Sequence, residues 1–174
     1  DSEKREHYLE LASKLDDSML AVELTRAKQQ VRENNFEAAF DTLSSLKSSY
    51  PSNSIVLNLL KTTYLQLNLW QPLLELLPKL QKSKQIDSEE FASLTKKAQC
   101  GLLSEVAQQQ GSEGVIKHWD KLPKKHKQDA HLISCFAKQL IARKADSDAY
   151  TVIKENLKKF GSPELYSLLP EMNL

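Results

Sequence analysis

Apolar residues recur every three or four positions along most of the chain. In residues 19–33 they stand at Leu20, Leu24, Ala27 and Val31, and residues 36–46 show the same period. This spacing is typical of helices that bury one face. No segment alternates strictly between apolar and polar residues, so we predict an all-α fold without strands.

Helix-ending signals separate these periodic segments. Asn34 and Asn68 interrupt the pattern, and Pro51 prevents the second helix from continuing beyond Tyr50. Asn53 or Ser54 can cap the next helix. We expect the helices to cover residues 2–16, 19–33, 36–49, 54–67, 69–82, 88–110, 112–119, 124–143 and a segment around 149–160, with one more turn before Pro170.

The spacing of these helical pairs is close to 34 residues, the length of a tetratricopeptide repeat. Residues 20–53 place Ala39 and Leu43 at the A-x3-F positions of the repeat and Pro51 at its later proline. Residues 54–87 and 130–163 fit the same phase. Their signature residues are Leu57, Leu60, Tyr64, Leu73 and Leu77 in the first of these and Ile133, Phe136, Ala137, Leu140, Ala149 and Ile153 in the second.

The fold that this phase predicts is a right-handed superhelix of tetratricopeptide-like hairpins in a single domain, 1–174. Residues 1–18 form a lead-in helix before the first repeat. Residues 88–129 form an irregular hairpin in which Gly111 separates two helices, and residues 164–174 form a tail. Such stacks present a concave surface to peptides or helices of other proteins, so binding of protein partners is the expected function.

Groove positions of the repeats that are not used for packing are the first candidates for partner contacts. They are Lys28, Arg32, Asn58, Thr62, Gln66, Ser134 and Lys138. Their amide and basic groups suit recognition of peptide backbone and carboxylates. The alternative is that they form a solvated helix face.

A basic segment, residues 117–127, is the second candidate. Trp119, Lys121, Lys124 and Lys125 lie in it, together with two histidines and one acidic residue. Basic side chains beside an aromatic ring can bind phosphate, nucleic acid or an acidic segment of a partner protein. The alternative for Trp119 is packing in the core. Because the whole chain has 24 basic and 23 acidic residues, we do not expect nucleic acid among the partners.

Neither Cys100 nor Cys135 is assigned a second cysteine or a histidine at zinc spacing, so we expect two reduced, buried cysteines and no zinc site. A disulfide between them is the alternative. His126 and His131 are five residues apart, which does not suit two metal ligands on one helix. With only four glycines and no local catalytic triad, the chain is expected to have no enzymatic activity and no cofactor.

Several motifs resemble the HemY proteins of proteobacteria. They are the run LAVELTRA at 20–27, Leu69-Trp70, LLELLP at 73–78, GSEG at 111–114 before Trp119, and His7-Tyr8-Leu9 through Ala12. The resemblance covers about residues 1–165 and is specific in order and spacing.

The resemblance implies a tetratricopeptide protein of the bacterial inner membrane, on its cytoplasmic face, associated with haem biosynthesis. Its expected role is a scaffold for other proteins, with haem-biosynthesis enzymes as partners. The family's N-terminal membrane anchor and C-terminal repeats are not in this sequence, so we expect a soluble piece of a longer protein. The alternative is direct binding of haem or porphyrin through His118, His126 or His131 beside Trp119.

Overall fold

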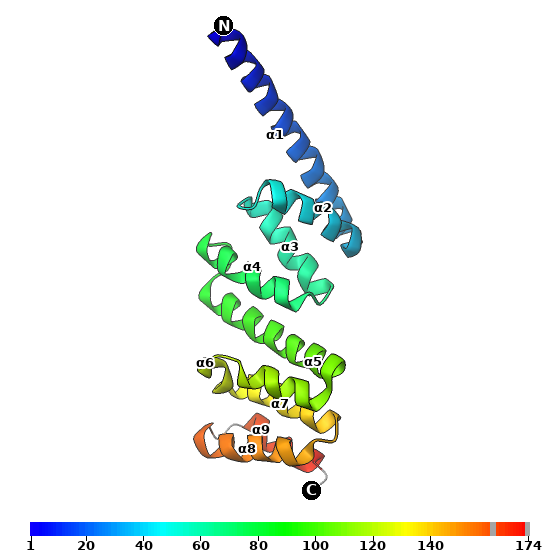
Figure 1. Ribbon diagram of the computed structural model, residues 1–174, viewed down its shortest axis with the longest axis vertical. Helices are drawn as coiled ribbons and strands as arrows, with labels where there is room; N and C mark the ends of the chain where they lie inside the picture. The colour runs from blue at the N-terminus through cyan, green and yellow to red at the C-terminus, as the bar shows by residue number, and fades with distance from the viewer. Residues whose placement is uncertain (161–162, 173–174) are drawn as a thin grey trace. The chain divides into compact units, whose positions relative to one another are not determined.

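The computed structural model describes residues 1–160 and 163–172. It has two compact units, Asp1–Ser88 and Glu89–Leu174. The described residues form α-helices and one 3-10 helix and contain no strand, which confirms the predicted all-α, helical-repeat fold (Figure 1).

The first unit is a set of antiparallel hairpins. Its helices are α1 (Ser2–Arg32), α2 (Phe36–Ser49), α3 (Ser54–Gln66) and α4 (Trp70–Lys82). Each packs against the next, and α1 also packs against α3. The side chain of Asn53 accepts hydrogen bonds from the backbone N–H groups of Ile55 and Val56, so it caps α3 as expected.

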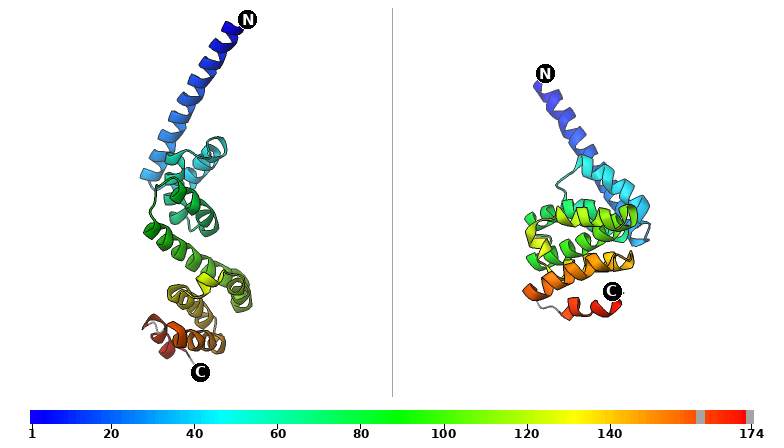
Figure 2. Two further views of the ribbon diagram at one scale, coloured as in Figure 1. Left: turned by 90° about the vertical axis from the view of Figure 1, so that its left-hand side faces the viewer. Right: turned by 60° about the horizontal axis from the view of Figure 1, so that its bottom comes forward.

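One expectation about this unit is wrong. We predicted separate helices at 2–16 and 19–33, but α1 is continuous over Ser2–Arg32. Asp16, Asp17 and Ser18 are tolerated inside a helix when they face solvent, and all three are exposed. Figures 1 and 2 show the first half of α1 extending beyond α2 and α3.

The second unit is built around α7. It contains α5 (Ser88–Asp120), α6 (Lys124–Lys127), α7 (Ala130–Ala142), α8 (Asp146–Phe160), α9 (Pro163–Tyr166) and a 3-10 turn (Leu169–Glu171). A single core joins α5, α7, α8 and α9. The prediction of one continuous helix over 124–143 is wrong, because α6 ends at Lys127 and α7 begins at Ala130. The carboxylate of Asp129 accepts a hydrogen bond from Leu132 N–H and caps the start of α7.

Gly111 divides α5 as the sequence predicted. Its φ of 71° and ψ of −166° are non-helical, so two helices meet at this residue. Backbone angles of this kind are almost restricted to glycine. The break allows residues 112–120 to turn back and bring Trp119 into the core.

The predicted repeat positions are core positions. Ala39, Leu43, Leu60 and Leu73 are fully buried in the first unit, and Ile133, Leu140, Ala149 and Ile153 are fully buried in the second. Tyr64 is buried against Phe40, with ring centroids 6.3 Å apart. Burial raises the pKa of Tyr64, and the nearby carboxylate of Glu75 raises it further.

The hairpin turns also repeat. Non-glycine residues with positive φ follow the ends of α1, α3, α4 and α7, each two positions after the last helical residue: Asn34, Asn68, Lys84 and Lys144. The next N–H donates to the carbonyl five residues before it, as in Asn35 to Gln30 (2.8 Å) and Leu69 to Tyr64 (2.9 Å). This is the Schellman arrangement of a helix C-terminus. Asn34 and Asn68 are 34 residues apart (68 − 34), which matches the period read from the sequence.

Lys144→Gly is expected to raise the free energy of unfolding by up to about 1 kcal/mol, because a left-handed conformation is unfavourable for a residue with a Cβ. Lys138→Gly is the matched control. Lys138 is exposed in the interior of α7, where glycine costs about 1 kcal/mol. Urea unfolding of both variants measures the two effects. A loss of stability in both would contradict the assignment of Lys144 as a left-handed turn residue.

Candidate functional site

The predicted groove residues of the first unit lie on two helices in contact. Lys28 and Arg32 are exposed on α1, Asn58 and Gln66 are exposed on α3, and Thr62 is half-buried. Because α1 packs against α3, these polar side chains belong to one pair of neighbouring helices. Whether a partner contacts them stays a prediction.

The groove residues of the second unit are only partly available. Lys138 is exposed on α7, but Ser134 is fully buried and its hydroxyl has no hydrogen-bond partner within the described residues. The expectation that Ser134 lines a groove is therefore wrong. On α7 it shares a face with apolar residues that pack into the core.

The basic segment divides into an exposed and a buried part. Lys121, Lys124 and Lys125 are exposed, and Lys127 Nζ donates to the carbonyl of Asp120 at 3.1 Å. Trp119 is only 7% exposed, and its ring stacks on Phe136 with centroids 4.5 Å apart. Of the two interpretations of Trp119, core packing is the one that the structure supports, so an exposed indole for a partner is not available there.

The three candidate haem ligands lie on three different segments: His118 near the end of α5, His126 in α6 and His131 in α7. His118 is half-buried, and its Nε2 has no hydrogen-bond partner in the part of the chain that the structure describes. Burial lowers the pKa of His118, and the ammonium of Lys121 lowers it further. The imidazole is therefore neutral at neutral pH. Haem binding stays a prediction.

A row of exposed apolar side chains on α1 was not predicted as a site. Tyr8, Leu11, Leu15, Met19 and Val22 are between 48% and 69% exposed. Their spacing of three or four residues places them on one side of the helix, and we call this row the α1 stripe. The face that packs into the first unit points to the other side by the same period and consists of Leu20, Leu24, Ala27 and Val31. Met19 lies at the edge of the stripe, where it lines a cavity together with Leu20 and Leu46. Tyr8, Leu11 and Leu15 were expected on one face of the lead-in helix, but that face was not predicted to be a contact surface.

The two cysteines form a disulfide, which overturns the expectation of reduced thiols. Cys100 on α5 and Cys135 on α7 have Cα atoms 5.6 Å apart, within the range that a disulfide needs. Both residues are half-buried rather than buried. Their separation of 35 residues in sequence gave no sign of this pairing.

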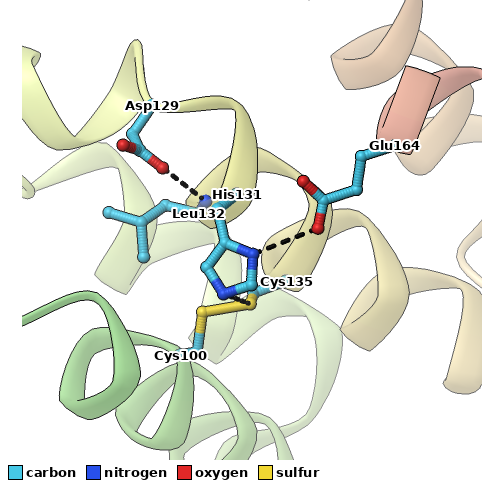
Figure 3. The surroundings of a disulfide bond; sticks show 6 residues. All are labelled: Cys100, Asp129, His131, Leu132, Cys135 and Glu164. Carbon is cyan, nitrogen blue, oxygen red and sulfur yellow. Dashed lines mark hydrogen bonds and ion pairs between the residues drawn. A yellow bond between two sulfur atoms is a disulfide. The ribbon is translucent and has the colours of Figure 1, made fainter. Parts of the chain in front are cut away.

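His131 lies directly beside the disulfide (Figure 3). Its Nε2 is 3.9 Å from Cys135 Sγ, and its Nδ1 is 3.1 Å from Glu164 Oε1. Within the described residues, one group of three side chains could together hold a metal ion: Cys100, His131 and Cys135. Their ligand atoms all lie within 4.8 Å of one another. His131 and Cys135 are four residues apart on one helix, so the prediction that neither cysteine has a histidine at zinc spacing is wrong.

A charged contact holds α5 against the start of α7 close to this group. Lys96 Nζ is 3.1 Å from Asp129 Oδ2. Burial by itself raises the pKa of Asp129, but hydrogen bonds from Leu132 N–H and from Lys96 outweigh it, and the pKa lies below its usual range. Farther along, Arg143 Nε donates to the carbonyl of Ala107 at 2.7 Å. Cys100 and Cys135 lie between these two contacts in sequence on both helices.

Comparison with known proteins gives one consistent result. The chain is 27% identical over 173 residues to the proteins named "Protein HemY" of Escherichia coli K12, Escherichia coli O157:H7 and Shigella flexneri. The matches cover 99% of this chain and 44% of each relative, so the chain spans less than half the length of these curated relatives. No family model and no solved structure matches. The resemblance to HemY proteins that the motifs predicted is confirmed.

None of the helices in the described part of the chain is long and apolar enough to cross a membrane.

Asp129→Ala is expected to lower the free energy of unfolding by about 1 kcal/mol at neutral pH, since it removes the cap of α7. Asp129→Asn keeps a capping oxygen and loses only the partly exposed ion pair, worth less than about 1 kcal/mol. Denaturant unfolding measures both.

The loss of unfolding free energy in Asp129→Asn should depend on pH. Because the folded-state pKa of Asp129 is lowered, its charge stabilises the fold above the ordinary carboxyl pKa and stops doing so as pH falls through the folded-state value. The difference between wild type and Asp129→Asn should therefore disappear in acid. A difference that stays constant with pH would show that the charge plays no part.

Proposed function

We propose that this relative of the HemY proteins is a protein-interaction scaffold associated with haem biosynthesis at the bacterial inner membrane. The α1 stripe is its main contact surface, and an amphipathic helix of a partner protein is the occupant. The observation that carries the proposal is the stripe itself. The link to haem biosynthesis rests on the resemblance to HemY proteins and on nothing else.

The stripe is a second apolar face on α1. The packed face uses Leu20, Leu24, Ala27 and Val31, and the stripe continues past the start of this packing to Val22 on the opposite side. Large apolar side chains in a contiguous exposed row indicate an interaction surface rather than chance exposure. Anchors spaced three and four residues apart fit a second helix lying along the first.

The exposed first part of α1, up to Met19, is a further reason to expect a partner. Every residue from Asp1 to Met19 is exposed. A helix without tertiary packing is only marginally stable in water, because nucleation is unfavourable and little apolar surface is buried. A partner helix that covers the stripe would supply the missing burial.

The charges near the stripe favour a protein over a lipid surface. Residues 1–19 contain six acidic and three basic side chains. Helices that lie on anionic membranes carry an excess of lysine and arginine on the polar face, and this helix has the reverse. The occupant that fits this balance is a partner helix with basic residues beside its apolar row.

The tetratricopeptide interpretation supports the same function. Buried residues at the predicted repeat positions and the left-handed Asn34 and Asn68 support it. In this proposal Lys28, Arg32, Asn58, Thr62 and Gln66 add a polar contact surface on α1 and α3, and Lys121, Lys124, Lys125 and Lys138 add exposed cations in the second unit. The proposal assigns no catalytic step to the chain.

A photoreactive amino acid at position 15, in the stripe, is expected to crosslink a haem-biosynthesis enzyme in cells that produce the full-length protein. Position 13 is the matched control, since Ser13 is exposed on the opposite side of the same stretch of α1. Leu15→Asp should abolish co-purification of the crosslinked enzyme, and Ser13→Asp, which adds the same charge, should leave it unchanged. Mass spectrometry identifies the crosslinked protein.

Equal crosslinking from positions 13 and 15 would contradict the stripe as the contact surface. Crosslinks from position 15 that contain only a second copy of this chain would show self-association instead. Crosslinks only to enzymes unrelated to haem would overturn the link to haem biosynthesis.

A further inference from the structure

The geometry around Cys100, Cys135 and His131 points to a zinc site that exists when the disulfide is reduced. We infer that the two thiolates and the imidazole bind one Zn²⁺ ion, with a water molecule in the fourth position, and that the disulfide is the metal-free, oxidised form of this site. The inference concerns the second unit and does not depend on the α1 stripe.

The residue types are those that zinc prefers. Thiolate sulfur and imidazole nitrogen are its usual protein ligands, and three protein ligands with an open fourth position are a known arrangement. His131 and Cys135 lie one turn apart on α7, on the same side of the helix, and Cys100 faces them from α5. The site is therefore made by two helices of one unit.

The distances are close to those of a tetrahedral site. With zinc–sulfur bonds of about 2.3 Å and zinc–nitrogen bonds of about 2.0 Å, neighbouring ligand atoms lie roughly 3.5 to 3.8 Å apart. The Nε2 of His131 is already 3.9 Å from Cys135 Sγ. After the S–S bond is broken, rotation about the single side-chain bond of each cysteine can separate the sulfurs without a shift of the helices.

Glu164 prepares the histidine for this role. Its Oε1 lies 3.1 Å from Nδ1 of His131, so a neutral imidazole donates Nδ1–H to the carboxylate and keeps the lone pair on Nε2, toward the sulfurs (Figure 3). Zinc-ligating histidines usually hold such a partner on the other ring nitrogen, which fixes the tautomer and raises the basicity of the ligand.

The helices do not need the disulfide to stay in place. Lys96 and Asp129 join α5 to the start of α7, and Arg143 and the carbonyl of Ala107 join the two helices farther along. Leu103 and Phe136, close to the two cysteines in sequence, are buried in the shared core. Reduction therefore leaves the two thiols facing each other beside His131.

The surroundings of the three side chains are also suited to the entry and binding of a zinc ion. A cleft of about 460 Å³, lined by Ser93, Lys96, Lys97, Cys100 and His131, opens beside the sulfur atoms. The ammonium groups of Lys96 and Lys97 lie at this cleft, and Lys96 is paired with Asp129. Two thiolates balance the charge of the zinc ion, so these lysines do not oppose the loaded site.

The disulfide is reduced before the zinc ion binds. A dithiol reductant gives two electrons and two protons to the disulfide, which becomes two thiols, and the reductant closes to its own disulfide. Zinc then displaces the two thiol protons, which pass to solvent. In a compartment that keeps thiols reduced, the zinc-binding form is the one expected.

Titration of the full chain with Co²⁺, a coloured substitute for Zn²⁺, tests the inference. The reduced chain under anaerobic conditions should bind one equivalent, with thiolate-to-cobalt charge-transfer and tetrahedral d–d absorption that Zn²⁺ abolishes. The oxidised chain should show neither. Cys100→Ser should remove the charge-transfer band or reduce it strongly.

Single-residue variants separate a specific site from general metal binding. His131→Ala leaves both cysteines intact and should weaken Zn²⁺ affinity at least about 10-fold, and Glu164→Gln should weaken it about 10-fold through the orientation of the ring. His126→Ala is the matched control in the same unit and should leave affinity unchanged. No cobalt absorption in the reduced wild type, or equal losses in His131→Ala and His126→Ala, would overturn the inference and leave the cysteines as a crosslink only.

Discussion

The burial of one apolar face per helix is the constraint on which the structure depends. Each hairpin covers one side of its helices, and Ala39, Leu43, Leu60 and Leu73 fill the first unit in this way. A helix with a second apolar face has no place for it inside the unit. The α1 stripe is such a face, so the same rule that builds the fold leaves an uncovered apolar surface at its start, and this is the surface that we propose a partner covers.

The second unit uses polar contacts beside its core to fix the relation of two helices. Asp129 starts α7 by capping it and ties it to Lys96 on α5. The break at Gly111 returns the chain so that Trp119 stacks on Phe136. Together these features hold Cys100 opposite His131 and Cys135. The chemistry inferred for this group therefore depends on local helix signals as much as on apolar packing.

Much of the fold could be predicted from the sequence, because its helices are marked by local signals. The apolar period marks the helices, Asn34 and Asn68 mark helix ends, and Asn53 marks a helix start. Contacts between residues far apart in the sequence could not be predicted from such local signals. The pairing of Cys100 with Cys135 depends on how α5 and α7 pack, and no local pattern encodes it. Burial of Ser134 also depends on packing. The sequence prediction that neither cysteine has a histidine at zinc spacing was wrong, because His131 and Cys135 are four residues apart on one helix.

Hydrogen exchange along α1 tests most directly the claim that this helix carries an uncovered interaction face. In the chain alone, amides of residues 2–19 should exchange almost without protection, while residues 20–32 should be protected, because the buried and half-buried residues of α1 all lie in the second range. Binding of the partner captured from position 15 should slow exchange over 2–19. Protection of residues 2–19 equal to that of 20–32 in the monomeric chain would contradict the account.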